Sequence, residues 1–169
     1  MMKLSHILVD GLLACVPFTV VVLTSFRLKP RLWLHSLPQD IQSMAAPKTN
    51  AERKLTGWMG SVVLFCFFGI PILLTWKRHL QVPGGFSGVE AVAYLYGVWM
   101  IVNAWDLVGI DWPYAYWVDP DQPPIPGTEG AEGYKKYGFH ARAFFKASVF
   151  SLAIIVPAGI AVSLVPLAQ

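Results

Sequence analysis

Four long apolar runs constrain what this chain can fold into more than any other feature of its sequence. They cover residues 7–26, 55–76, 91–118 and 147–167. Each is about as long as the roughly 20 residues that an α-helix needs to cross the hydrocarbon core of a bilayer. Three charged residues interrupt them, namely Asp10, Asp106 and Asp111. Charged residues make up 14% of the whole chain, well below the roughly 25% of a soluble domain, so we expect a membrane protein.

These runs predict an all-α, polytopic membrane protein with four transmembrane helices in an up-down bundle. We expect a single membrane domain over residues 1–169, with helices at about 5–26, 53–76, 88–112 and 139–165. The two longer connections are then about 27–52 and 113–138, on one side of the bilayer. A cleavable signal peptide is the alternative for the first run. That run is longer than a usual signal sequence and lacks a small-residue cleavage pattern after it, so we expect it to remain a helix.

Basic residues are distributed unevenly between the two sides of the predicted bundle. Of the 13 Lys and Arg residues, six lie in residues 27–54 and four in residues 135–146, whereas the opposite side carries three. Connections rich in Lys and Arg stay in the cytoplasm, which predicts that both termini lie outside. The net charge of +3 serves this orientation and is not a signal for nucleic-acid binding. The expected surroundings are therefore the lipid bilayer.

Charges within the third and fourth helices are the clearest pointer to a functional site, because an ionisable group in hydrocarbon usually has a reason to be there. Asp106 lies seven residues before Pro113, which places it roughly 10 Å inside the end of its helix at 1.5 Å per residue. Lys146 lies at a similar depth in the fourth helix. The matching depths predict two ion pairs, Asp106–Lys146 and Asp111–Arg142.

Two interpretations of these charges remain open. Buried ion pairs can simply set which helices pack together. Alternatively, the charges form a ligand or proton site. The third helix favours a polar interior here, because Tyr96, Trp99, Asn103 and Asp106 are spaced by three, four and three residues and share one face. Asp111 would point about 140° away from Asp106 at ~100° per residue.

The connection between the third and fourth helices holds the least generic stretch of the chain. Its glycines permit tight turns, and its acid, phenol and imidazole groups are Glu129, Tyr134, Tyr137 and His140. One hypothesis is that it folds over the Asp106 region as a lid. The other is that it is an ordered connector with tyrosines at the lipid headgroups. No spacing matches a metal motif, so we predict no metal site.

A second polar pair, His6 and Asp10, lies near the start of the first helix. The two residues are four apart and therefore on one helix face. They form either an interfacial pair at a helix end or an imidazole oriented by a carboxylate. Known nucleotide-binding, nucleophile-elbow and zinc-protease motifs are missing from the sequence. Cys15 and Cys66 have unrelated spacing and predict no disulfide.

Several segments resemble small bacterial four-helix integral membrane proteins of uncharacterised activity. The resemblance is carried by Asp111-Trp112, by Pro126-Gly127-Thr128-Glu129-Gly130, by Tyr134 to His140, by Phe144-Phe145-Lys146, and by residues 38–42 and 47–49 of the first connection. It covers about half of the chain. It implies a bacterial origin, a location in the cytoplasmic (inner) membrane and the four-helix layout. It brings no known activity, so no catalytic residue can be carried over from it, and any cofactor stays unknown.

Three functions remain open on these grounds. The first is a protein that binds a lipid or small apolar ligand, or an accessory subunit of a larger membrane complex or homo-oligomer. The second is a membrane-embedded enzyme acting on a lipid or isoprenoid-like substrate, with Glu129 or His140 as acid/base and Arg142 or Lys146 holding an anionic group. The third is a small proton-coupled transporter that titrates Asp106.

Overall fold

The computed structural model describes residues 3–167, and the regular elements within that range are all helical. Three helices are long and apolar enough to cross a membrane: Leu4–Leu28, Asn50–Gln81 and Gly88–Trp117. A fourth crossing results if Tyr137–Phe150 and Leu152–Ser163, which meet at 41°, count as one span. The prediction of an all-α chain with several membrane-length helices is therefore confirmed, with three or four such spans.

Shorter elements divide and connect these helices. The first is α1, Leu4–Leu28, followed by η1, Pro30–Ser36, and α2, Gln39–Met44. The second long helix consists of α3 (Asn50–Leu64), η2 (Phe65–Gly69) and α4 (Ile70–Gln81). The third consists of α5 (Gly88–Trp105), η3 (Asp106–Asp111) and α6 (Trp112–Trp117). The short η4 (Glu132–Lys135) precedes α7 (Tyr137–Phe150) and α8 (Leu152–Ser163).

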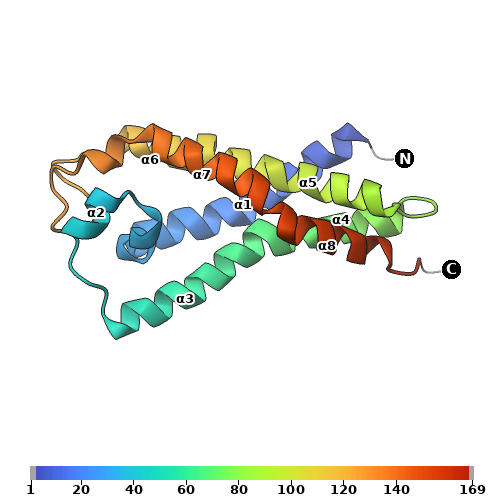
Figure 1. The fold of residues 1–169 in the computed structure, drawn as a ribbon, viewed down its shortest axis with the longest axis horizontal. Coiled ribbons are helices and arrows are strands. Elements are labelled where there is room, and N and C mark those ends of the chain that lie inside the picture. The colour runs from blue at the N-terminus through green and yellow to red at the C-terminus, as the bar shows by residue number, and fades with distance from the viewer. Residues whose placement is uncertain (1–2, 168–169) are drawn as a thin grey trace.

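Helix α5 is the centre of the bundle. It packs against α1 on one side and against α8 and α4 on another. Trp99 is fully buried, and its ring lies 5.3 Å from that of Phe67 and 5.7 Å from that of Phe68 between centroids. The start of α1 and the end of α8 lie at one end of the molecule, at the right in Figure 1. We call this the terminal end.

The opposite end is covered by η1, α2 and residues 118–136, and we call it the capped end (Figure 1). The two connections that meet there bury a small core of their own. Its members are Leu34, Leu37, Ile41, Ala45, Val118, Ile125, Ala131 and Tyr134. The Asp40 carboxylate ties the connections together, accepting from the Gly133 N–H at 2.7 Å and pairing with Lys136 at 3.3 Å. Burial raises the pKa of Asp40, but these two partners outweigh that effect and lower it below its usual value.

Two capping boxes fix where the second and third long helices begin. The Thr49 hydroxyl accepts from the backbone N–H of Glu52, whose side chain accepts from the Thr49 N–H. Ser87 and Glu90 repeat the arrangement at the start of α5. Each box satisfies backbone donors that a helix start otherwise leaves unpaired. The second long helix therefore begins at Asn50, three residues before its predicted start at about residue 53.

The third long helix continues to Trp117, five residues past its predicted end at residue 112. Proline usually ends or kinks a helix because it has no N–H and its ring crowds the preceding turn. Pro113 instead follows Trp112, the first residue after the wide turn η3, where the regular hydrogen-bond pattern is already interrupted. The helix therefore passes through Pro113 and carries Tyr114 and Ala115 into the capped end.

Gly159 on α8 permits the close approach of α8 to α5. A Cβ added at Gly159 would lie 2.7 Å from the Val92 Cα, which is backbone and cannot rotate away. We predict that Gly159→Ala lowers the free energy of unfolding by about 1–3 kcal/mol, the usual cost of overpacking. Thermal unfolding in detergent, followed by tryptophan fluorescence, measures it. Gly57→Ala is the matched control, because no atom lies within 4 Å of its Cβ, and its Tm should not fall. Equal Tm values for Gly159→Ala and the unchanged protein would contradict this packing argument.

Candidate functional site

The candidate site forms at the wide helical turn η3. The N–H of Trp112 donates to the carbonyl of Leu107, five residues back, which is the π-helical pattern often found at functional sites. In a regular α-helix, Asp106 and Asp111 would point in different directions. The wider turn places residues five apart nearly above one another. As a result, both carboxylates line the same cavity.

This cavity has a volume of about 210 Å³ and lies between α1, η1, η3 and α7 at the capped end. We call it the carboxylate cavity. Most of its wall is apolar. Its polar side chains are Ser36, Asp106, Asp111, Tyr114 and His140.

His140 and Asp111 contact one another through a hydrogen bond inside the carboxylate cavity. The Nδ1 of His140 lies 2.9 Å from Oδ2 of Asp111, and the imidazole is buried. A carboxylate that accepts from Nδ1–H orients the ring and leaves Nε2 of a neutral imidazole as an acceptor. The wide turn positions Asp111, and the first turns of α7 position His140. The oriented imidazole can therefore accept a hydrogen bond from a bound group.

Two other polar groups of the cavity have no partner. Within residues 3–167, the half-buried Asp106 forms no ion pair, and the fully buried Tyr114 hydroxyl makes no hydrogen bond. An unpaired buried polar group costs about 1–3 kcal/mol. Such groups in a folded protein require an explanation, for example a bound polar molecule. The cavity therefore offers an unpaired carboxylate beside an oriented imidazole.

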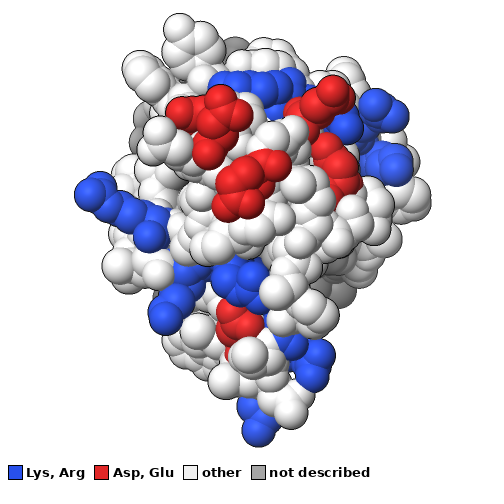
Figure 2. Space-filling model, turned by 90° about the vertical axis from the view of Figure 1, so that its left-hand side faces the viewer, with Lys and Arg blue, Asp and Glu red and all other residues white. Residues whose placement is uncertain are grey.

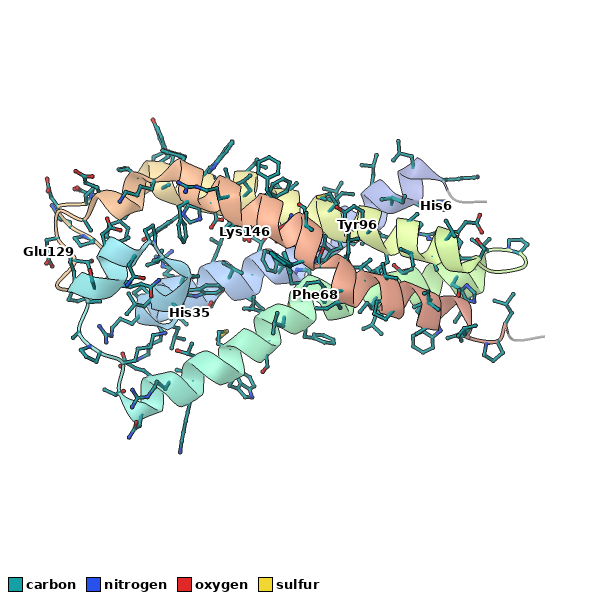
Figure 3. The ribbon with its side chains drawn as sticks, viewed as in Figure 1. His6, His35, Phe68, Tyr96, Glu129 and Lys146 are labelled. Carbon is teal, nitrogen blue, oxygen red and sulfur yellow. The ribbon has the colours of Figure 1, made fainter. Side chains whose placement is uncertain are left out.

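The two ion pairs predicted from helix depth do not form among the described residues. Lys146 and Arg142 are exposed on α7 and line a different, outer groove. Figure 3 labels Lys146 on α7. The prediction was wrong because depth alone does not set direction. At ~100° per residue, Arg142 and Lys146 lie roughly 200° and 240° around α7 from His140, so the face that reaches Asp111 carries the imidazole.

The remaining predicted site residues lie outside the carboxylate cavity. The Asn103 amide donates to the Phe144 carbonyl at 3.4 Å and to the Ser148 hydroxyl at 3.2 Å, which ties α5 to α7. Tyr134 is buried in the core of the capped end, with its hydroxyl 2.7 Å from that of Thr128. Burial raises the pKa of Tyr134.

Glu129 and Tyr137 are exposed. Glu129 accepts from the Gly127 N–H in its own loop and lies at the far left of Figure 3. The Tyr137 ring packs edge-on against Trp112, at 6.4 Å between centroids. The loop therefore covers the capped end as an ordered connector, and of its four predicted groups the cavity receives His140.

A second polar cluster lies at the terminal end. Arg78 donates to both oxygens of Asp10 at 2.9 and 3.2 Å, and the Tyr94 hydroxyl donates to Asp10 at 2.5 Å. Asp10 is therefore satisfied by α4 and α5, and the predicted His6–Asp10 pair is not formed. The sequence analysis placed neither Arg78 nor Tyr94 in a site. The clue in the sequence was position: Arg78 and Tyr94, like Asp10, lie near helix ends that meet at the terminal end.

Metal-ligating side chains do not gather within residues 3–167: no group of three or more His, Cys, Asp or Glu is placed to hold an ion. Asp106, Asp111 and His140 line one cavity, yet they do not make such a group. Comparisons with protein-family models, with curated proteins and with solved structures found no match. The resemblance to small bacterial four-helix membrane proteins therefore stays a prediction.

The bidentate Asp10–Arg78 pair should be a strong point of the fold. Removing one partner of a buried pair leaves the other charge uncompensated and costs about 3–5 kcal/mol. Asp10 is 6% exposed and Arg78 20%, so we expect Arg78→Gln to fall at the lower end of that range. Urea-dependent unfolding in detergent measures this loss. Lys77→Gln removes the neighbouring exposed cation and should leave stability unchanged. If both variants behave alike, the pair does not stabilise the bundle.

Proposed function

We propose that this protein is a multi-pass membrane protein that binds a small, largely apolar ligand with a polar head. The head occupies the carboxylate cavity and is an amine or a hydroxyl group. The observation that carries this proposal is Asp106, which has no ion-pair partner within residues 3–167, beside the Asp111–His140 pair in a mostly apolar cavity. Carboxylates accept hydrogen bonds and attract cations, and charge-assisted bonds of this kind are about twice as strong as neutral ones.

The size of the cavity supports a ligand whose body extends beyond it. Pockets that enclose a whole drug-sized molecule occupy about 300–1,000 Å³, and this cavity has about 210 Å³. It therefore suits a head group better than a complete ligand. The rest of such a ligand needs an apolar medium.

The walls of the cavity supply a route to that medium. Leu23 of α1 and Ala143 of α7 line the cavity and are themselves exposed on the outside of the bundle. Over the described residues, α1 and α7 do not pack against one another. A ligand dissolved in the bilayer can thus approach between these two helices. This route favours a membrane-borne ligand over one from water.

The Asp111–His140 pair favours one alternative, a membrane-embedded enzyme acting on a lipid or isoprenoid-like substrate. An imidazole oriented by a carboxylate is a common general acid or base. Transport through the bundle has less support within residues 3–167. The space between the two polar clusters is filled by buried apolar side chains, among them Ala14, Phe18 and Val102.

The binding proposal is tested by native mass spectrometry with a photoreactive long-chain alkylamine as the probe. The purified protein should be labelled on residues lining the carboxylate cavity. Asp106→Asn should reduce labelling at least about tenfold, the effect expected when a charged hydrogen bond of about 1.5–3 kcal/mol is lost. The length-matched alkane probe without the amine should label weakly.

Asp121→Asn is the matched control, because Asp121 is an exposed acid in the same half of the chain. It should be labelled like the unchanged protein. Equal labelling of Asp106→Asn would remove the basis of the proposal. Turnover of an added lipid that is lost in His140→Gln, with labelling intact, would favour the enzyme instead.

We also propose four membrane crossings with both termini outside and the capped end in the cytoplasm of a bacterial cell. The start of α1 and the end of α8 lie at the same end of the molecule (Figure 1), and the excess of basic residues at the capped end supports this orientation. Cysteine-accessibility labelling tests it, with Cys15 and Cys66 first replaced by Ala. In intact cells, a membrane-impermeant maleimide should label a cysteine at Ser87 and spare one at Glu129. The reverse pattern would invert the topology.

A further inference from the structure

A large groove at the capped end carries more positive than negative charge. It lies beside α2, η4 and α7 and has a volume of about 860 Å³. We call it the basic groove. Four cationic side chains and one carboxylate line it: Lys135, Lys136, Arg142, Lys146 and Asp40.

Within residues 3–167, three of these cations have no protein counter-charge, and two of the three, Arg142 and Lys146, lie on one helix. Lys136 is paired with Asp40, and Lys135 donates to the Tyr116 carbonyl at 3.0 Å. Arg142 donates one N–H to the Gly138 carbonyl of its own helix. Within residues 3–167, no carboxylate lies within 4 Å of Arg142 or Lys146. An anion from outside the protein can therefore bind both.

The spacing of these two residues suits a single anionic group. Arg142 and Lys146 are four residues apart on α7, so they occupy the same face roughly 6 Å apart along the axis. Arg presents a planar fork of donors that matches phosphate oxygens, and Lys adds a second charge. Neighbouring Lys136 lies at the edge of the same groove.

The surroundings of Lys146 indicate that the anion belongs to a lipid. Phe145, Val149 and Phe150 follow on α7 and are 67%, 65% and 74% exposed. Bulky apolar side chains so exposed fit the acyl region of a bilayer, which α7 and α8 together are long and apolar enough to cross. Lys146 thus lies where exposed apolar surface gives way to charge, the level of the headgroups. Figure 2 faces the capped end and shows Lys and Arg on several sides of it, with most of the Asp and Glu in the upper half of the view.

We propose that the basic groove binds the phosphate of an anionic phospholipid from the surrounding leaflet. Arg142 and Lys146 hold the phosphate, and the exposed apolar face of α7 receives the acyl chains. Basic pockets at the membrane surface bind anionic headgroups in this way. This site is separate from the carboxylate cavity, although Phe139 and Ala143 line both. It does not depend on the ligand proposed for that cavity.

Native mass spectrometry of delipidated protein in a neutral detergent tests the proposal. Phosphatidylglycerol should bind at least about tenfold more tightly than phosphatidylcholine, because each nearby cation contributes roughly 1 kcal/mol toward an anionic lipid. The double variant Arg142→Gln/Lys146→Gln should lose most of this preference. The charge-conserving variant Lys146→Arg should keep it. Inorganic phosphate at millimolar concentration should not displace the lipid.

The matched control is Arg53→Gln/Lys54→Gln, which removes two exposed cations at the start of α3. It changes the net charge equally and should leave the preference intact. Equal binding of the two lipids, or an unchanged preference in Arg142→Gln/Lys146→Gln, would overturn the proposal. Full displacement by inorganic phosphate would also overturn it, since the groove would then be a site for a soluble anion. Alkylamine labelling of the carboxylate cavity should continue in Arg142→Gln/Lys146→Gln, so this proposal and the binding proposal can fail separately.

Discussion

A regular α-helix would turn Asp111 about 140° away from Asp106, and only one of the two carboxylates would then face α7. The wide turn from Asp106 to Asp111 removes this separation. The cavity, the contact with His140 and the passage of the helix through Pro113 all depend on that turn. A π-helical turn weakens the regular backbone ladder, and such turns are frequent at functional sites. The irregular backbone of this turn places both carboxylates on the same side of the helix.

The acidic side chains at the two ends of the bundle differ in how fully they are paired. At the terminal end, Asp10 receives a bidentate guanidinium and a phenol, so its acceptor capacity is largely used. At the capped end, Asp106 has no ion-pair partner within residues 3–167, and Asp111 has the imidazole. Helix packing alone accounts for a buried charge whose partners are all present, and no ligand is needed to explain it. An unsatisfied carboxylate in an apolar cavity does not, which is why the functional proposal rests on the capped end.

The helices and one helix start could be predicted from the sequence, because length, hydropathy and capping are local properties. The Thr49 and Glu52 pattern is an example, since a capping box involves residues three apart. The pairing of charges could not be predicted in this way. Asp10 and Arg78 are 68 residues apart, and only the packing of α4 against α1 brings them together. The wide turn at Asp106–Asp111 also leaves no simple sequence pattern, so the predicted direction of Asp111 was wrong.

The predicted ion pair between Asp106 and Lys146 was wrong, and the reason shows how the faces of α7 are arranged. Both residues were placed at the same depth, but a helix position has an angle as well as a depth. His140 lies on the inner face, while Arg142 and Lys146 share the opposite one. Phe139 and Ala143 lie between these faces and line both the carboxylate cavity and the basic groove. One short helix thus separates an inner acidic site from an outer basic one, and it keeps opposite charges from neutralising each other. That separation leaves each site able to bind a ligand of the opposite charge.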